Sequence, residues 1–302
     1  MSGRGALYGL SAAAIWGGMY VVSDVVLETI PPFTLLALRL ILGLIVLALI
    51  LGRMRDVRLP QGGERLKILG IGLLGFGISV GAQFVGTEKS TAVNGSLITS
   101  ASPAFILIFA ALILRERLTP RRIMAVGLAT IGVALIVDPA QADFGSETFA
   151  GDVALAIAAL TWGLYSVLVR QVSARLDTLV VTIFAFIGGL CLVVPAAFVE
   201  LSQRPIGAVD AGTILGILYL GIASTAGAMW LWNRAFALVD ASTASLFFFA
   251  QPVVGAFLGV VLLGQALTPN IIAGGLLIVL GVLLSVYTPA RLKRPQSLQT
   301  VE

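Results

Sequence analysis

A long internal repeat restricts the fold of this 302-residue chain more than any other feature of its sequence. Each copy has a proline, a Leu-Thr-Pro triplet starting fifteen residues later, and a glycine twelve residues after the triplet. These landmarks are Pro103, Leu118-Thr119-Pro120 and Gly132 in the first copy, and Pro252, Leu267-Thr268-Pro269 and Gly281 in the second. The offset between them is 149 residues, and Trp16-Gly17 matches Trp162-Gly163 at an offset of 146. The two halves are therefore expected to share one architecture.

The composition places this repeated architecture in a membrane. Hydrophobic residues make up 58% of the chain, charged residues 11%, and the mean hydropathy is +1.03. A helix that crosses the bilayer needs about 20 predominantly apolar residues. The sequence supplies ten such stretches, five in each half, at residues 5–27, 32–52, 66–87, 91–114, 121–137, 151–171, 177–200, 212–234, 241–263 and 269–288. It therefore predicts an all-α membrane protein with ten transmembrane helices. The first stretch belongs to the repeat, so we expect it to be retained and not cleaved as a signal peptide.

Two residue types that often carry chemistry are almost missing. The chain has no histidine and one cysteine, Cys191. An internal disulfide, a cysteine-based metal site and an imidazole base are thereby excluded. We expect neither a cofactor nor a metal ion.

The basic residues fall on alternate connections between the predicted spans. One side receives 16 of the 19: Arg4, Arg53, Arg55, Arg58, Arg65, Lys67, Arg115, Arg117, Arg121, Arg122, Arg170, Arg175, Arg234, Arg291, Lys293 and Arg294. The connection at 138–152, on the other side, has four acidic residues and no basic one. The positive-inside rule then predicts that both termini are cytoplasmic, in a bacterial inner membrane. Because the charges are spread over short loops, they do not form a nucleic-acid-binding face.

An odd number of spans in each repeat has a topological consequence. The second unit must enter the membrane in the opposite orientation, so the halves are predicted to be inverted repeats. The expected units are residues 1–140 and 141–290, followed by a cytoplasmic tail at 291–302. In transporters with such repeats, the binding site lies near the midplane and opens to each side in turn.

Two short motifs resemble enzyme signatures but lie in the wrong context. The glycines at 70, 72 and 75 match the spacing of a dinucleotide-binding loop, but they lie inside an apolar helix, where close helix packing explains them better. Residues 77–81 match a nucleophile elbow around Ser79, yet there is no histidine to activate a serine. We therefore expect no enzyme activity.

Arg39 lies within the second predicted span, six residues after Phe33 and about 9 Å along the helix. A charge at membrane depth is costly unless it faces protein or water, and it indicates a functional site by default. The equivalent position in the second half is Ala185. Two interpretations stay open: a structural pair with Asp24 or Glu28 or a side chain that extends to the membrane interface, or a direct role with an anionic substrate group or a gate.

Other polar and aromatic residues on the spans are candidates for the lining of a cavity. The aromatic candidates are Trp16, Tyr20, Trp162, Tyr165, Trp230 and Phe248. The polar candidates are Gln83, Asn94, Ser100 and Gln251. The alternative is that the aromatic residues form interfacial belts and the polar ones join helices. Pro103 and Pro252 are expected to break helices at matching positions and free backbone carbonyls.

These residues also resemble a known family. The ten-span layout, the two Trp-Gly pairs, Arg39 and the two proline-to-glycine segments are similar to those of the drug/metabolite transporter superfamily, EamA type, over nearly the whole chain. Within it, the chain looks most like bacterial amino-acid exporters of the YddG type. The second copy departs from the first, because Gly264-Gln265-Ala266 replaces the surroundings of Glu116. The resemblance implies efflux of aromatic and other amino acids.

The sequence thus predicts a transporter of small molecules, with amino acids or related metabolites as its substrates and the lipid bilayer as its surroundings. We expect a monomer, alternating access and no proton coupling, because acidic residues cluster at the helix ends and loops. Export of other metabolites or drugs with proton coupling stays open, as does a channel or a structural subunit of a membrane complex.

Overall fold

The computed structural model describes residues 3–55, 57–89, 98–99, 101–137, 149–251, 253–254 and 269–286. All the regular structure in these residues is helical, and no strand occurs among them. The predicted all-α class is therefore confirmed.

The helices of the first half begin and end close to the predicted spans. They are α1 (Gly3–Leu27), α2 (Pro32–Leu51), the continuous run α3 (Gly62–Gly72), η1 (Leu73–Ser79) and α4 (Val80–Lys89), then α6 (Ser102–Ile113) and α7 (Pro120–Val137). Residues 98–99 are also helical, whereas 91–97 and 100 of the predicted fourth span lie outside the described part.

The second half follows the same order. Its helices are α8 (Phe149–Ser173), α9 (Thr178–Gln203), the run α10 (Ala211–Leu218), η3 (Tyr219–Gly227) and α11 (Ala228–Leu238), the run α12 (Ala241–Ala244) and η4 (Ser245–Phe249), and α14 (Pro269–Val286). Within the described residues, five helical runs are long and apolar enough to cross a membrane: Pro32–Leu51, Gly62–Gly86, Phe149–Ser173, Thr178–Gln203 and Ala211–Leu238.

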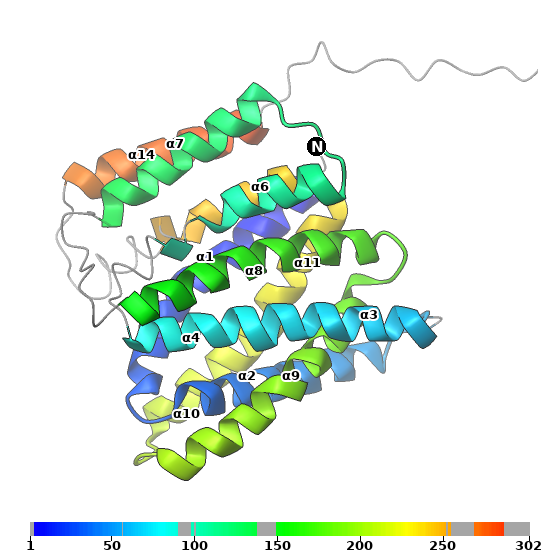
Figure 1. Cartoon of the computed structure of the whole chain (residues 1–302), viewed down its shortest axis with the longest axis vertical. Coiled ribbons are helices and arrows are strands. Elements are labelled where there is room, and N and C mark those ends of the chain that lie inside the picture. The colour runs from blue at the N-terminus through cyan, green and yellow to red at the C-terminus, as the bar shows by residue number, and fades with distance from the viewer. Residues whose placement is uncertain are drawn as a thin grey trace, which may run out of the picture.

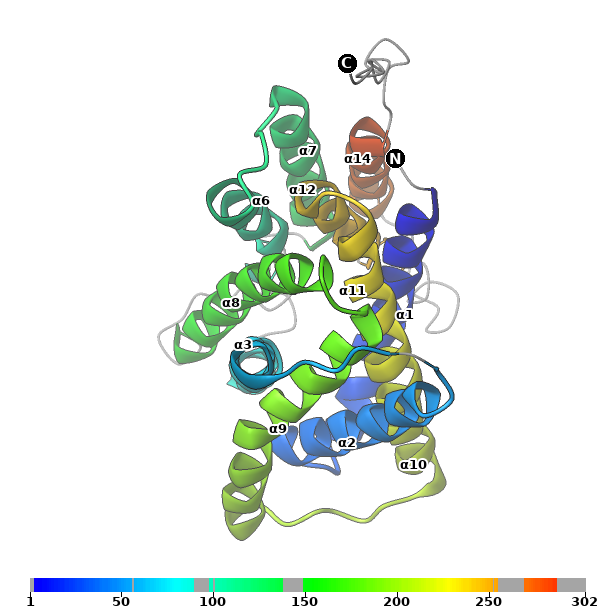
Figure 2. The ribbon, with the colours of Figure 1, turned by 90° about the vertical axis from the view of Figure 1, so that its right-hand side faces the viewer.

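The packing of the helices has a regular pattern, which can be followed in Figures 1 and 2. Helix α1 packs against α11, and α8 packs against α4. Helix α9 packs against α3 and η1, and α2 packs against η3 and α10. Helix α2 also packs against α9, and α7 packs against α14. Each of these pairs has its counterpart when every helix is exchanged for its equivalent in the other half, whereas the packing of α8 on α11 has no such counterpart among the described residues.

Small residues allow the backbones to approach closely between α3 and α9. A Cβ atom added to Gly72 would lie 2.0 Å from the backbone oxygen of Ala185, and one added to Gly188 would lie 2.0 Å from that of Leu69. Neither position has room for a side chain. Gly75 has a similar role, because its added Cβ would lie 2.3 Å from the ring of Tyr165. Two of the three glycines of the dinucleotide-like motif are therefore packing positions, as predicted.

Two segments depart from regular α-helix at matching places. η1 and η3 are π-helical, and each lies in the middle of a longer helical run. In η3, the hydroxyl of Thr225 donates to the carbonyl of Leu220, five residues earlier, at 2.7 Å. π-Helical turns are rare and occur frequently at functional sites. The hydrophobic pattern of the sequence did not predict η1 or η3.

Acidic side chains accept hydrogen bonds from backbone N–H groups at the N-termini of α2 and α10. The carboxylate of Glu200 on α9 accepts from the backbone N–H groups of Phe33 (3.0 Å) and Thr34 (2.8 Å) at the start of α2. Asp210 precedes α10 and accepts from the backbone N–H of Thr213 at 2.7 Å and from its hydroxyl at 2.6 Å. The hydroxyl bond, and after it the backbone bond, lowers the pKa of Asp210 below its ordinary value of 3.8.

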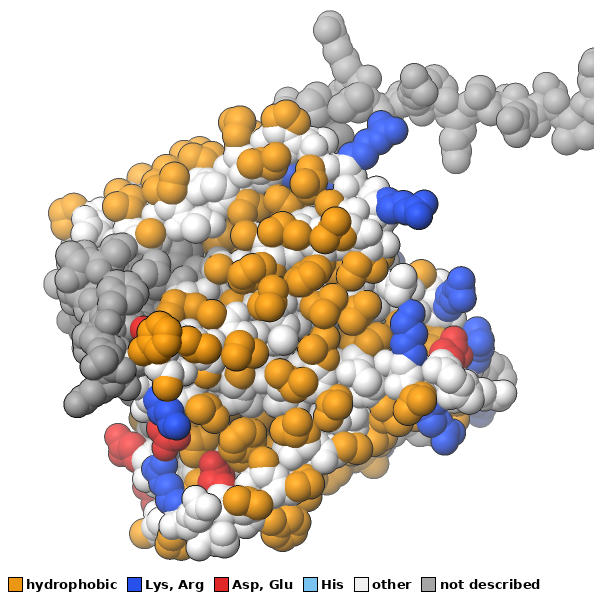
Figure 3. Space-filling model, in the orientation of Figure 1, with side chains coloured by type: hydrophobic (Ala, Val, Ile, Leu, Met, Phe, Trp, Pro, Cys, Tyr) orange, Lys and Arg blue, Asp and Glu red, His pale blue; other side chains and the backbone are white. Residues whose placement is uncertain are grey.

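The surface suits a lipid environment. Figure 3 shows hydrophobic side chains across the middle of one face, with charged side chains toward its ends. The exposed large apolar side chains of the described residues include Phe198, which is 71% exposed. Such an extensive apolar surface would be unfavourable in water but is expected for helices in a bilayer.

Candidate functional site

Three tryptophans from different helices meet inside the molecule. Trp16 lies on α1, Trp162 on α8 and Trp232 on α11, and all three are buried. The ring centroids of Trp16 and Trp162 are 5.9 Å apart, and those of Trp16 and Trp232 are 5.3 Å apart. Phe248 on η4 lies 6.2 Å from Trp16 and 5.7 Å from Trp232. With Tyr165, whose ring lies 5.0 Å from that of Trp162, these residues form what we call the aromatic site.

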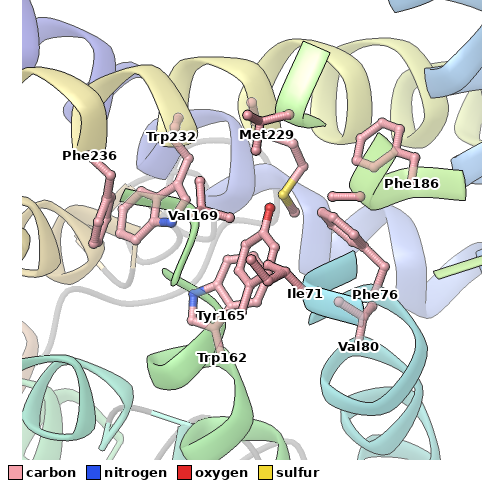
Figure 4. Close-up of a cluster of buried hydrophobic side chains, with 14 of the residues drawn as sticks. Ile71, Phe76, Val80, Trp162, Tyr165, Val169, Phe186, Met229, Trp232 and Phe236 are labelled. Atoms are coloured by element: carbon pink, nitrogen blue, oxygen red, sulfur yellow. The ribbon is translucent and has the colours of Figure 1, made fainter. Parts of the chain in front are cut away.

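The aromatic site draws on both halves of the chain. Figure 4 shows the side chain of Trp232 reaching from α11, and those of Trp162 and Tyr165 reaching from α8, into the same space. Trp16 and Trp162 are the repeat-related tryptophans of the sequence, and their rings contact each other edge to face. The repeat therefore brings its own equivalent residues together at the junction.

Several polar atoms at this place lack a hydrogen-bond partner among the described residues. They include the indole Nε1 atoms of Trp162 and Trp232 and the Oε1 atom of Gln251. An added Cβ on Gly17 would lie 3.0 Å from the backbone oxygen of Gln251, so this glutamine lies beside the Trp16 turn of α1. A buried polar group without a partner costs about 1–3 kcal/mol. Two indole donors without partners among aromatic rings, with the amide oxygen of Gln251 three residues after Phe248, are what a polar ligand with an apolar side chain would need.

Behind the aromatic site lies a buried polar network. The amide of Asn233 donates to the hydroxyl of Tyr165 at 3.1 Å and to the hydroxyl of Thr182 at 2.9 Å. The hydroxyl of Thr182 in turn donates to the carbonyl of Thr178 at 2.7 Å. Because Asn233, Tyr165 and Thr182 are all fully buried, this network holds α8, α9 and α11 in a fixed relation.

Arg39 is buried and is held by the π-helical segment η3. Its Nε atom donates to the hydroxyl of Thr225 at 3.1 Å, and Nη2 lies 3.4 Å from the hydroxyl of Ser224. The carbonyl of Ser224 accepts from Nε1 of Trp16 at 3.0 Å. Ser224 thus connects Arg39 to the aromatic site. Arg39 also lies over the ring of Phe84, 5.6 Å from its centroid.

The remaining predicted residues have varied positions. Trp230 is only partly buried and packs against Tyr8, with centroids 6.0 Å apart, so it lies beside the aromatic site and not in it. Gln83 is partly buried on α4. Pro103 lies in the first turn of α6, where the carbonyl of Ala101 accepts from two N–H groups. Asn94, Ser100, Pro252 and the side chains of Tyr20 and Asp24 lie outside the described part.

Several residues of this region were not predicted from the sequence. Asn233 is a polar residue within an apolar stretch, the same signal that singled out Gln83 and Gln251, and it could have been found in that way. Trp232 lies two residues after Trp230 in the span predicted at 212–234, and it is Trp232 and not Trp230 that reaches the aromatic site. Ser224 and Thr225 gave no signal, because hydroxyl residues are common in membrane helices.

Taken together, the fold and this site define a helical membrane protein of the transporter class. The sequence profile of the EamA-like transporter family matches the chain twice, over residues 3–138 and 149–287. The chain belongs to this family, within the drug/metabolite transporter superfamily, as the sequence predicted.

Relatives match over nearly their full length. An uncharacterized transporter of Bacillus subtilis (strain 168), YoaV, is 26% identical over 94% of this chain and 97% of its own. A probable amino-acid metabolite efflux pump of Salmonella typhimurium is also 26% identical, over 95% of this chain and 96% of its own. A solved crystal structure that is 24% identical superposes with a TM-score of 0.79, over 93% of this chain and 97% of that one, which shows a shared fold.

Proposed function

We propose that this protein exports amino acids, aromatic ones among them, across the bacterial inner membrane by alternating access. The observation that carries the proposal is the aromatic site with the unpartnered atoms of Trp162, Trp232 and Gln251. Two indole N–H donors suit a carboxylate, an amide oxygen suits an ammonium group, and the surrounding rings suit an apolar side chain. An amino-acid zwitterion combines these three features. The relative described as an amino-acid metabolite efflux pump supports the same substrate class.

The architecture that we propose is a pair of inverted five-helix repeats, residues 1–140 and 141–290, with both termini and the tail at 291–302 in the cytoplasm. Two observations support it. The family profile matches each half separately. Several helix contacts also have their counterpart when the halves are exchanged, among them α1 on α11 and α8 on α4. A site at the junction between such repeats is where substrate and gates meet in known transporters.

Arg39 has a supporting role in this proposal. Its guanidinium group is held by Thr225 and Ser224, and the Ser224 carbonyl binds Trp16. A substrate that moves the Trp16 ring would therefore also displace the buried guanidinium group of Arg39. Arg39 is the only charged side chain that is buried within the described residues. No buried acidic group there offers a proton site, which favours facilitated diffusion or exchange.

Solute counterflow in proteoliposomes tests this proposal. Purified protein should accumulate labelled phenylalanine, tryptophan and leucine against an excess of the unlabelled amino acid inside, with saturation. We expect Trp16→Ala and Arg39→Ala each to reduce the rate more than tenfold, which corresponds to about 1.4 kcal/mol or more. Uptake driven by an imposed pH gradient would contradict the uncoupled mechanism.

A control variant separates function from folding. Phe198→Ala removes an exposed aromatic side chain that belongs neither to the aromatic site nor to the buried core around it. It should leave counterflow within about twofold of the parent, as surface changes usually do. A wild-type protein that moves none of the amino acids in either direction would overturn the proposed function.

A further inference from the structure

A cluster of ion pairs joins helices of both halves at the arginine-rich end of the molecule. Arg170 at the end of α8 lies 3.4 Å from Glu116 and 3.4 Å from Asp240. Arg122 on α7 pairs with the same two acids, at 3.7 Å from Glu116 and in direct contact with Asp240. Each guanidinium group is therefore shared between two carboxylates. We call these four residues the arginine cluster.

The arginine cluster also binds backbone groups. Glu116 accepts from the N–H groups of Ala241 (2.8 Å) and Ser242 (3.1 Å), where α12 begins, and from the hydroxyl of Ser242 at 2.6 Å. Arg170 donates to the carbonyl of Phe236 at 2.6 Å, close to the end of α11. The cluster thus joins the α6–α7 connection and α8 to the segment between α11 and α12. Opening this end of the molecule would require these bonds to break.

A cleft of about 760 Å³ lies beside the cluster. It is lined by all four residues of the cluster and by Arg115 and Arg117. These two arginines are exposed, and within the described residues no ion pair joins either of them. The lining therefore has four guanidinium groups and two carboxylates, and its charge is positive. A cleft of this sign attracts and concentrates anions.

We propose that this cleft is the cytoplasmic loading site of the transporter, and that it binds solutes through a carboxylate, which replaces Glu116 or Asp240 on Arg122 and Arg170. The proposal rests on the proposed function for its direction, because it places this end in the cytoplasm. A guanidinium group binds any carboxylate in the same bidentate manner. When one carboxylate replaces another, both guanidinium groups stay paired, and the displaced carboxylate remains in the cleft with Arg115 and Arg117. An incoming acid can therefore free α12, whereas an uncharged solute cannot.

The kinetic test compares transport of substrate offered from the two faces of the membrane, because the cleft lies at the arginine-rich face only. The double variant Arg115→Gln/Arg117→Gln removes two charges that hold no element of the fold. We expect it to raise the half-saturation concentration for phenylalanine about fivefold or more when phenylalanine is offered from the arginine-rich face, by loss of electrostatic attraction. From the opposite face the value should change less than twofold. Phenylalanine amide, which has no carboxylate and carries a net positive charge, should show no such rise from either face.

The matched control is Arg53→Gln/Arg55→Gln. It removes the same number of charges from exposed positions after α2 that do not line the cleft. The helix that follows, α3, adjoins the cleft, since Lys67 donates to Gln171 of its lining at 2.9 Å. Equal effects of the two double variants would overturn the proposal, as would an effect that is the same from both faces.

A binding experiment tests the cleft without relying on transport. Benzoate should raise the thermal midpoint of the purified wild-type protein in detergent, benzamide should not, and the Arg115→Gln/Arg117→Gln variant should lose the benzoate shift. If amino-acid counterflow fails in the wild type but this pattern is found, the loading site stands and the proposed substrate is wrong. If counterflow succeeds and benzoate has no effect that depends on these arginines, the loading site is wrong and the proposed function stands.

Discussion

At the scale of the residue, two neighbouring tryptophans differ in one bond. The indole N–H of Trp16 donates to the carbonyl of Ser224, whereas that of Trp232 has no partner within the described residues. Trp16→Phe and Trp232→Phe delete the same atoms from buried rings. We expect Trp16→Phe to lower the free energy of unfolding by about 1 kcal/mol more, because it also removes a hydrogen bond. Denaturant titration in detergent micelles measures the difference.

The two variants should also differ in transport because, of the two indole N–H groups, only that of Trp232 lacks a partner within the described residues. If the free N–H of Trp232 binds the substrate carboxylate, Trp232→Phe raises the half-saturation concentration for phenylalanine about tenfold, the equivalent of one charge-assisted hydrogen bond. The value for phenylalanine amide should change much less. Equal half-saturation concentrations in Trp232→Phe and the wild type would contradict a substrate bond at this atom.

At the scale of the element, the contact between α3 and α9 depends on glycine at two positions. In Gly72→Ala the new methyl group would overlap the backbone of Ala185, so we expect a loss of stability of about 1–3 kcal/mol or more. Gly70→Ala is the matched control: it lies on the same helix, has no atom within 4 Å of an added Cβ, and should be neutral or stabilising by up to about 1 kcal/mol. Thermal unfolding of the two variants in the same detergent gives the comparison.

A second prediction at this scale concerns the cap of α10. The pKa of Asp210 is lowered in the folded protein by its bonds from Thr213, so its carboxylate contributes stability above its ordinary value of 3.8. This contribution is lost as the pH falls through the folded-state pKa. We therefore expect Asp210→Asn to have a lower thermal midpoint than the wild type at pH 7, and the two midpoints to converge below pH 3.8. A difference between the two thermal midpoints that stays constant down to low pH would contradict this account. The control is Glu64→Gln, which removes a carboxylate that forms an exposed ion pair.

The sequence predicted the helices well, because apolar stretches and turns fix where a membrane helix starts and stops. The span predicted at 121–137 is α7, Pro120–Val137, and that at 177–200 is α9, Thr178–Gln203. The π-helical segments could not be predicted from the hydrophobic pattern. A π-helical turn contains one more residue than an α-helical turn, but the residues themselves are as apolar as those of the surrounding helix. In the site, Trp16, Trp162, Tyr165 and Phe248 come together, whereas the hydrogen bonds of Ser224 and Glu116 depend on residues more than 100 positions away along the chain.

At the scale of the whole molecule, the inverted topology that we propose predicts which positions face the same side of the membrane. In a Cys191→Ser background, single cysteines at Arg58 and Ala174 should react with a membrane-impermeant maleimide from the cytoplasmic side only. Cysteines at Lys89 and Pro205 should react from the opposite side only. Each pair samples both halves at exposed positions, so the labels test inversion directly. Reaction of Arg58→Cys and Ala174→Cys from opposite sides would contradict the proposed repeats.

The glycine contact between α3 and α9 also limits how the molecule can change shape. At Gly72 and Gly188 one backbone rests on the carbonyl of the other, with no side chains between them that could repack. Surfaces in such contact cannot slide past each other without losing the fit on both sides. We therefore expect α3 and α9 to move as one unit, so that any rocking motion takes place around this contact. Distances between labels on α3 and α9 should therefore stay constant during a transport cycle, while those between α12 and the α6–α7 connection change.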